Sequence, residues 1–285
     1  MPTAVYSDRP ASVLAHLNPA RMLSTLWAHR ALALQLARRD IESRYKAQRL
    51  GLLWAVLNPL VLLAIYTFVF GVVFPNRWNA AREEHLGLFA LNVFLGLVTF
   101  GLFRDLFNHA PGLVVANRNY VKRVVFPLEV LSIADFLSCL FTLAIGLGVW
   151  LAGYLAIVRQ LPPPEALLFP VLVLPVALAG LAASWFLSAL TVFVRDLSNA
   201  VEMVSTVLFF LTPIFYSLDH VPPSFRAVLR YSPLTQAVES ARAAMIRGEQ
   251  PDWSAWAITL AASGLAALFA FAFFTKSRRA FADVL

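Results

Sequence analysis

The chain has 285 residues, of which 60% are hydrophobic and only 14% are charged, and its mean hydropathy is +0.71. Soluble domains carry about 25% charged residues, so this composition excludes an ordinary soluble domain and predicts a protein that crosses a membrane several times. The net charge of +7 does not point to nucleic acid here, because Lys and Arg also collect on the cytoplasmic side of membrane proteins.

The first 50 residues are expected to stay outside the hydrocarbon layer. Residues 1–20 are polar and hold three prolines, so we expect a loose cytoplasmic tail. Residues 21–50 follow the pattern of one amphipathic helix, in which these apolar residues recur near one face: Leu23, Trp27, Leu34 and Ile41. We interpret it as a helix lying in the membrane interface, although a solvated helix before the first span stays open. We expect no cleavable signal peptide, because no apolar stretch precedes a small-residue cleavage site.

Residues 51–285 are predicted to form an all-α domain with six transmembrane helices. A helix rises 1.5 Å per residue, so about 20 apolar residues cross the ~30 Å hydrocarbon layer. The six uncharged or nearly uncharged runs are 52–74, 86–103, 130–158, 166–194, 197–218 and 253–275. The fifth is the weakest, because Glu202 lies near its start and Pro213 near its end.

An even number of spans places both termini on the same side of the membrane. Under this topology, 16 Lys and Arg residues fall on the side of the termini and seven on the other side. Basic residues favour the cytoplasm, so both termini are predicted to be cytoplasmic.

Two connecting segments are predicted to be helical. On the external side, residues 222–247 should form short amphipathic helices that dip back into the membrane. Ser232 and Pro233 suit a helix start there, and Gly248 suits a helix end. On the cytoplasmic side, Pro111 should end the second span, and residues 110–123 should form a short basic helix. A rigid helix on the cytoplasmic face is suited to contact a soluble motor protein. The alternative that this segment only connects two spans remains open.

Sequence motifs for catalysis are missing. The chain has no phosphate-binding loop of the G-x-x-x-x-G-K-[ST] type and no His-Glu-x-x-His zinc motif. We therefore expect no enzyme activity in this chain and no metal site. The five histidines are scattered and are expected at interfaces: His16, His29, His85, His109 and His220. Cys139 is the single cysteine and is expected to be a packed core residue.

Two features left alternatives open. Asp135 lies inside the third predicted span, where an ionisable group is either functional or paired, for example with Arg123 or Arg195. Aromatic residues cluster in the first and fifth spans: Tyr66, Phe68, Phe70, Phe209, Phe210, Phe215 and Tyr216. Aromatic faces suit sugar C–H groups, but their spacing alone favours a lipid-facing aromatic belt.

Four segments carry a resemblance to a known family. They are RRDIESRYKAQRLGLLWAVLNPLVLLAIYTFVFGVVF ending at residue 74, NRNYVKRVVFPLEVL at 117–131, VRDLSNAVEMV with LTPIFY within 194–216, and YSPLTQAVESARAAMIRG at 231–248. Together with the six spans, the chain resembles the membrane subunit of ABC-2 type polysaccharide exporters, which secrete O-antigen, capsule and teichoic-acid chains.

The resemblance implies a homodimer in the bacterial inner membrane, bound to two copies of a separate ATPase that holds ATP and Mg²⁺. It implies that the cargo is a lipid-linked polysaccharide and that the helices at about 30–49 and 110–123 contact the ATPase. The implied coupling residues are Arg118, Asn119, Tyr120, Lys122 and Arg123. It also implies that the seven aromatic residues line a channel and that 222–247 forms its outer gate.

A basic cluster is expected to attract the pyrophosphate of the lipid carrier as it enters from the cytoplasmic leaflet. The cluster comprises Arg38, Arg39, Arg44, Lys46 and Arg49. Two alternatives remain open at this point: an ABC-2 permease for a small lipid or drug, and a stand-alone membrane enzyme that acts on lipid-linked sugars.

Overall fold

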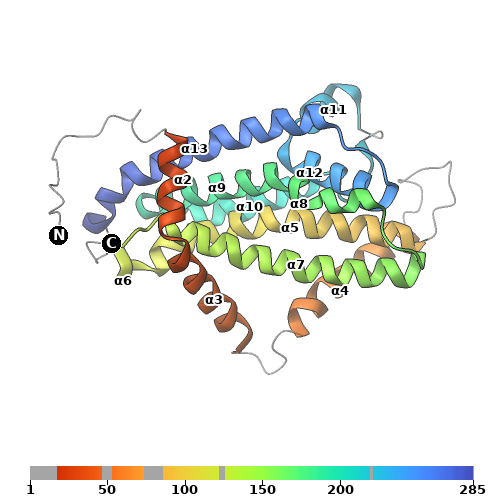
Figure 1. Ribbon diagram of the computed structural model, residues 1–285, viewed down its shortest axis with the longest axis horizontal. Helices are drawn as coiled ribbons and strands as arrows, with labels where there is room; N and C mark the ends of the chain where they lie inside the picture. Colours follow the sequence, from red (N-terminus) through yellow and green to blue (C-terminus); the bar gives the residue numbers. More distant parts are fainter. Residues whose placement is uncertain (1–17, 47–52, 74–85, 122–125, 219–220, 285) are drawn as a thin grey trace.

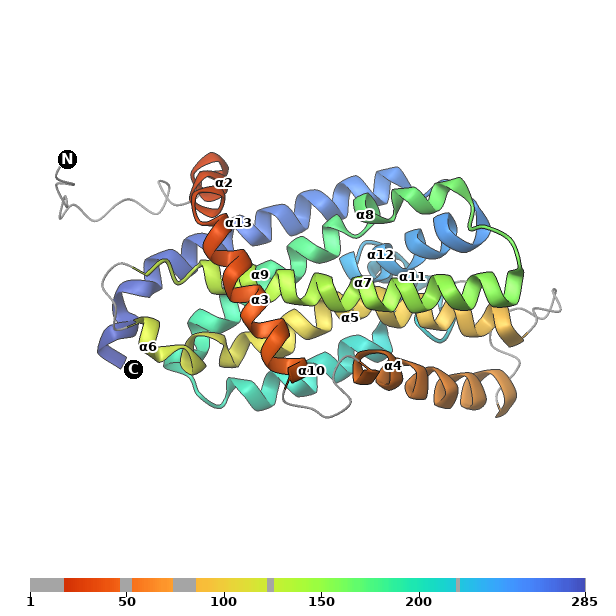
Figure 2. The same cartoon turned by 60° about the horizontal axis from the view of Figure 1, so that its bottom comes forward.

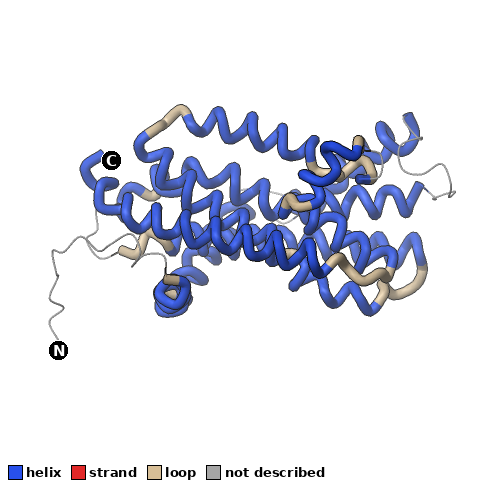
Figure 3. The backbone as a smooth tube through the Cα atoms, turned by 90° about the horizontal axis from the view of Figure 1, so that it is seen from above, coloured by secondary structure: helices blue, strands red, loops and turns tan. Residues whose placement is uncertain are grey.

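The computed structural model describes residues 18–46, 53–73, 86–121, 126–218 and 221–284, and these residues form helices and turns with no strand among them (Figures 1 and 3). The α-helices are α2 (Pro19–Ala28), α3 (Arg30–Lys46), α4 (Leu53–Tyr66), α5 (Leu86–Ala116), α6 (Arg118–Val121), α7 (Val130–Val158), α8 (Phe169–Leu172), α9 (Leu174–Phe193), α10 (Leu197–Leu211), α11 (Pro223–Arg230), α12 (Pro233–Arg242) and α13 (Trp253–Val284). Shorter turns are η1 (Thr67–Val73) and η5 (Ala243–Arg247), which are π-helical, and η3 (Pro164–Leu168), which is a 3-10 turn.

Long apolar helices form the bundle. Within the described residues, four helical stretches are long and apolar enough to cross a membrane: Leu86–Ala116, Val130–Val158, Pro164–Phe193 and Trp253–Phe281. α9 packs between α5 and α13, and α5 also packs on α7. The helices approach closely where side chains are small, since a Cβ on Gly180 of α9 would lie only 2.7 Å from Leu106 Cδ1 of α5. The described part of the chain is therefore helical, and its long apolar helices indicate a multi-pass membrane protein.

The first predicted span, 52–74, is helical over Leu53–Val73, but its last turns are π-helical, and the fifth span is a shorter helix than expected. α4 gives way to the π-helical turn η1 after Tyr66, and α10 ends at Leu211. The prediction that the fifth helix continues to residue 218 is wrong. Thr212 adopts an extended conformation with ψ of 133°, because a residue that precedes a proline disfavours the helical region.

The predicted end of the second helix is also wrong. α5 continues through Pro111 to Ala116, and Pro111 and Val114 are buried against the bundle. A proline inside a helix costs about 3 kcal/mol, and we attribute its tolerance here to this tertiary packing. The predicted helix at 110–123 is thus the last turns of α5 followed by the four-residue α6. α13 likewise extends beyond residue 275 to Val284.

The N-terminal region forms two helices instead of one. α2 ends at Ala28 and α3 begins at Arg30, and the pair crosses the bundle at an angle (Figure 2). α3 packs on α7 through the buried residues Ala33, Leu36 and Ala37. Leu23, Trp27 and Leu34, which the sequence placed on one apolar face, are exposed.

The two short helices before α13 agree closely with the predicted range 222–247. Pro223 and Pro233 occupy the first turns of α11 and α12, and Gly248 ends η5 with a φ of 65°. α11 lies at the opposite end of the bundle from α6 and the C-terminal part of α13 (Figure 1). These two ends are called the α11 end and the α6 end.

Candidate functional site

Aromatic rings from α4, α5 and the segment around α10 form one cluster. The ring of Tyr66 lies 4.7 Å from that of Phe215 and 6.1 Å from that of Phe209. Phe209 also contacts Phe215 at 5.4 Å and Phe100 of α5 at 5.6 Å. These separations lie in the range in which aromatic pairs stabilise each other, so the cluster fixes α4 and α10 to α5.

The seven aromatic residues predicted to line a channel do not share one environment. Phe68 and Phe210 are each 60% exposed, whereas Phe215 is buried. Tyr216 donates its hydroxyl to the carbonyl oxygen of Leu211 at 2.7 Å, where it satisfies a free carbonyl at the end of α10. The side chain of Phe70 lies outside the described residues. The rings of Phe68 and Phe210 are therefore exposed, whereas those of Tyr66, Phe209 and Phe215 pack against one another.

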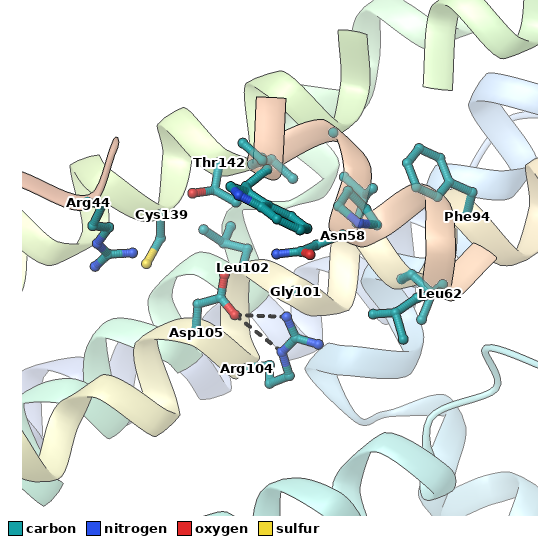
Figure 4. Close-up of a pocket in the computed structure, with 17 residues that line it drawn as sticks. Arg44, Asn58, Leu62, Phe94, Gly101, Leu102, Arg104, Asp105, Cys139 and Thr142 are labelled. Atoms are coloured by element: carbon teal, nitrogen blue, oxygen red, sulfur yellow. Dashed lines mark hydrogen bonds and ion pairs between the residues drawn. The ribbon is translucent and has the colours of Figure 1, made fainter. Parts of the chain in front are cut away.

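A cavity of about 490 Å³ lies between α4, α5 and α7 (Figure 4). Its polar lining includes Arg44, Asn58, Thr142 and the ion pair between Arg104 and Asp105, whose atoms lie 3.1 Å apart. Most of the remaining lining is apolar: Trp54, Ala55, Pro59, Leu62, Phe94, Leu97, Val98, Leu102, Cys139 and Leu143. The lining of the cavity therefore combines a few charged and polar side chains with a mostly apolar wall.

The predicted basic cluster is divided among several partners. Arg38 pairs with Glu42 at 2.9 Å, and Arg39 donates to the hydroxyl of Tyr120 on α6 at 2.7 Å. Arg44 pairs with Asp40 at 2.9 Å and borders the cavity. Lys46 is the last residue of α3, and Arg49 lies outside the described residues.

The predicted coupling residues lie beyond the end of α5. Arg118 and Asn119 are exposed on α6, and the ring of Tyr120 stacks on Phe126 with centroids 4.4 Å apart. Lys122 and Arg123 lie outside the described residues. Through the Arg39–Tyr120 hydrogen bond, α6 is connected directly to α3.

Asp135 has partners that the sequence did not suggest. Its Oδ1 lies 2.9 Å from His109 Nδ1 and 3.5 Å from Arg44 Nη2, so the expected partner Arg195 is replaced by groups from α5 and α3. The predicted second span ends at residue 103, before His109, so no sequence pattern indicated that His109 lies on a helix face that packs on α7. The continuation of α5 past residue 103 turns His109 toward α7.

Arg242 of α12 was also missed. It is 0% exposed and donates to the carbonyl oxygens of Pro213 at 2.6 Å, Ile214 at 2.7 Å and Asn92 at 3.2 Å. Glu239 lies 3.0 Å from the same guanidinium. Burial lowers the pKa of Arg242, and Glu239 opposes this shift. In the sequence, Arg242 is flanked by alanines within an amphipathic helix. This pattern is compatible with a buried arginine, but it is equally typical of an exposed one.

The start of α13 carries a second charged contact at the α11 end. Arg230 and Asp252 form an ion pair, and Asp252 also accepts hydrogen bonds from Ser254 Oγ at 2.6 Å and from the backbone N–H of Ala255 at 3.1 Å. The hydrogen bond from Arg230, followed by these two, holds the pKa of Asp252 well below its usual range.

Comparison with known proteins identifies the family. Residues 32–246 match the model of the ABC-2 type transporter family. The chain is 28% identical over 261 residues to the O-antigen export system permease protein RfbA of Myxococcus xanthus, covering 91% of this chain and 96% of that protein. It is 26% identical over 260 residues to an RfbA of Klebsiella pneumoniae, covering 89% and 95% of the two chains. It is 27% identical over 216 residues to the polysialic acid transport protein KpsM of Escherichia coli, covering 74% and 79%. The family match covers well over half of the chain, and the protein therefore belongs to the ABC-2 type transporter family.

Proposed function

We propose that this chain is the membrane subunit of an ATP-driven exporter that moves a lipid-linked polysaccharide, of the O-antigen or capsule type, across the bacterial inner membrane. The observation that carries the proposal is the end-to-end similarity to O-antigen export permeases, which extends over 91% of the chain. The chain has no phosphate-binding loop, so ATP and Mg²⁺ bind to a separate ATPase subunit. The subunit itself is a transporter component and not an enzyme.

In this proposal the chain crosses the membrane six times. The four long apolar helices supply four crossings, and α4 with η1 and α10 with the segment to residue 218 supply the other two. The α6 end faces the cytoplasm with both termini, and the α11 end faces outward with the re-entrant helices as a gate. The bias of basic residues toward the side of the termini favours this orientation.

The transport channel forms between two copies of the chain. α4 with η1 and α10 each carry large exposed apolar residues, including Phe68 of η1 and Phe210 of α10, which are suited to the channel wall. Their rings offer flat apolar faces to the sugar units, and the Tyr66–Phe209–Phe215 cluster holds the backbone behind them in place. Two ATPase subunits bind the α3 and α6 helices of the dimer.

The carrier lipid enters beside α3. Arg38, Arg39, Arg44 and the basic residues that follow attract its phosphates from the cytoplasmic leaflet. Arg44 borders the cavity between α4, α5 and α7, whose apolar wall is suited to an acyl or polyprenyl chain. A guanidinium next to an apolar cavity matches the two parts of such a lipid.

The first test is purification of the chain from native membranes, followed by identification of bound proteins and measurement of ATPase activity. We expect a stoichiometric subunit with a phosphate-binding loop, and ATP hydrolysis that rises with lipid-linked polysaccharide and not with small amphiphilic drugs. Stimulation by drugs alone would support a small-molecule permease instead. An intact chain that turns over lipid-linked sugars without any ATPase would contradict the proposal.

A further inference from the structure

Three potential metal-ligating side chains converge where α5 and α7 meet near the α6 end. Asp135 and Cys139 lie one helical turn apart on α7, and His109 faces them from α5. One ligating atom from each of the three lies within 4.8 Å of the other two. Asp135 and Cys139 are buried, and His109 is partly exposed. This group of imidazole, carboxylate and thiol borders the basic cluster, because Arg44 Nη2 lies 3.5 Å from Asp135 Oδ1.

One atom of the group lacks a partner. The side chain of Asp135 is only 5% exposed, and its Oδ2 has no hydrogen-bond partner among the described residues. A buried carboxylate oxygen without a donor costs about 1–3 kcal/mol or more, so such an atom calls for an explanation. A bound cation supplies one, because it replaces the missing donor.

The surrounding charges also leave room for a cation. Arg104 pairs with Asp105 at 3.1 Å, and Arg44 pairs with Asp40 at 2.9 Å. Arg44 reaches Asp135 at the longer distance of 3.5 Å. With a neutral His109, these two partly exposed arginines face the three carboxylates of Asp40, Asp105 and Asp135, so the cluster carries one uncompensated negative charge, and Asp135 is its buried member. A proton on His109 or a metal ion would compensate this charge.

We propose that His109, Asp135 and Cys139 form a binding site for a divalent metal ion of the zinc class. Nitrogen, oxygen and thiolate sulfur are the donors that Zn²⁺ takes, and a tetrahedral ion keeps its fourth position for water when three protein ligands are present. The carboxylate and the thiolate together neutralise the ion. The bond lengths of a zinc site place donor atoms about 3.3–3.7 Å apart. His109 Nδ1 and Asp135 Oδ1, which are 2.9 Å apart, therefore need to separate slightly, and donor atoms that lie up to 4.8 Å apart need to close by about 1 Å.

The cavity provides the path to this site. Cys139 belongs to the cavity lining, as does Arg44, and both appear on the same side of it in Figure 4. When the ion binds, the thiol proton of Cys139 leaves to water through the cavity. His109 gives up the Nδ1 proton that it shares with Asp135 Oδ1, so Nδ1 can bind the ion through its lone pair, and the neutral ring carries its one proton on Nε2; the proton balance is closed by water in the cavity. The bound ion joins α5 to α7 directly beside α3, so it would limit relative movement of these three helices.

Cobalt titration of the purified full-length chain tests this site. The chain has a single cysteine, so a thiolate-to-Co²⁺ charge-transfer absorption arises only from Cys139. We expect this absorption to saturate at one ion per chain, to disappear when Zn²⁺ is added and to be absent in Cys139→Ser. His109→Gln and Asp135→Asn should weaken binding more than about 100-fold, since even the loss of a group that only hydrogen-bonds to a metal ligand costs about 10–100-fold in affinity.

The matched control is His29→Gln, because His29 lies at the turn between α2 and α3, is hydrogen-bonded to the carbonyl oxygen of Thr25 and should leave the titration unchanged. The chain must carry an affinity tag without histidine. Absence of the charge-transfer absorption in monodisperse wild-type chain overturns the proposal, and so does equal affinity in His109→Gln. X-ray absorption of the zinc-loaded wild type needs no variant and should show one sulfur ligand; a sulfur-free zinc environment also overturns it.

Discussion

The two ends of the bundle contain different kinds of polar contact, one buried and one accessible to water. At the α11 end, the fully buried Arg242 binds main-chain carbonyls from α5 and from the segment after α10. At the α6 end, α3 and α6 meet through Arg39 and Tyr120, which are accessible to water. Breaking a buried charge network costs about 3–5 kcal/mol, whereas an exposed pair contributes about 0–1 kcal/mol. The contact made by Arg242 at the α11 end is thus built to keep its shape, and the contact between α3 and α6 at the α6 end is built to adjust.

The largest effect is expected at the α11 end. Arg242→Ala leaves the carbonyls of Asn92, Pro213 and Ile214 without their donor and should lower the free energy of unfolding by about 3–5 kcal/mol. Thermal unfolding of the purified chain measures this. Arg230→Ala is the control, because Arg230 is an exposed member of an ion pair and should cost about 1 kcal/mol or less. Equal losses in the two variants would remove the distinction between buried and exposed anchors.

A second variant sharpens the role of Arg242. A Cβ on Gly96 would lie 2.9 Å from Arg242 Nη2, so Gly96→Ala should destabilise the wild type by about 1–3 kcal/mol. In the Arg242→Ala background the clash is gone, and alanine should stabilise α5 by up to about 1 kcal/mol because it favours a helix over glycine. A double-mutant cycle measures this change of sign. Additive effects would show that Arg242 does not determine the space at Gly96.

The exposed aromatic residues near the α11 end should affect transport but not stability. Phe210→Ala removes a ring that is 60% exposed, and we expect polysaccharide export to fall about two- to tenfold, which corresponds to one aromatic contact. Export of labelled polysaccharide in cells, normalised to protein level, measures this. Phe269→Ala on α13 is a matched control, because Phe269 is also 60% exposed but lies away from α4 and α10. Equal losses in both variants would contradict a channel role for Phe210.

The smallest stability effect is expected at the α6 end. Arg39→Gln removes the charged donor to Tyr120 and should change the free energy of unfolding by less than about 1 kcal/mol. Export per ATP hydrolysed should nevertheless fall, because α3 and α6 no longer move together. Arg38→Gln is the matched comparison, because it removes the same charge from the basic cluster but leaves the Arg39–Tyr120 hydrogen bond in place, so the additional loss in Arg39→Gln measures the connection between α3 and α6. A large loss of stability in Arg39→Gln would contradict this comparison, because it would show that the contact between α3 and α6 stabilises the fold as strongly as the buried Arg242 does.

The sequence predicts the helices well where local signals agree with packing. Pro223, Pro233 and Gly248 mark helix ends in the sequence and do so in the structure. Pro111 is the opposite case, because its local signal for a helix end is overcome by the buried packing of α5. Local patterns cannot report such a balance, since the opposing packing comes from distant segments.

The candidate site also contains features that local sequence patterns predict and features that depend on contacts between distant residues. The aromatic residues were found because they cluster in the sequence, yet their separation into exposed and packed rings depends on the π-helical turn after Tyr66 and the break at Thr212. Contacts between distant residues left no local trace. Asp135 meets His109 across 26 positions, and Arg242 meets Asn92 across 150.

The Arg242 anchor also has a consequence for the order in which the chain assembles. The carbonyls of Pro213 and Ile214 lie outside a helix, and backbone groups without partners are costly near a lipid environment. Their donor follows 29 and 28 positions later in the chain. During synthesis from the N-terminus, α5 and α10 are therefore complete before the group that closes their contact exists. Insertion of α12 is then the step that commits α5, α10 and α12 to their native arrangement.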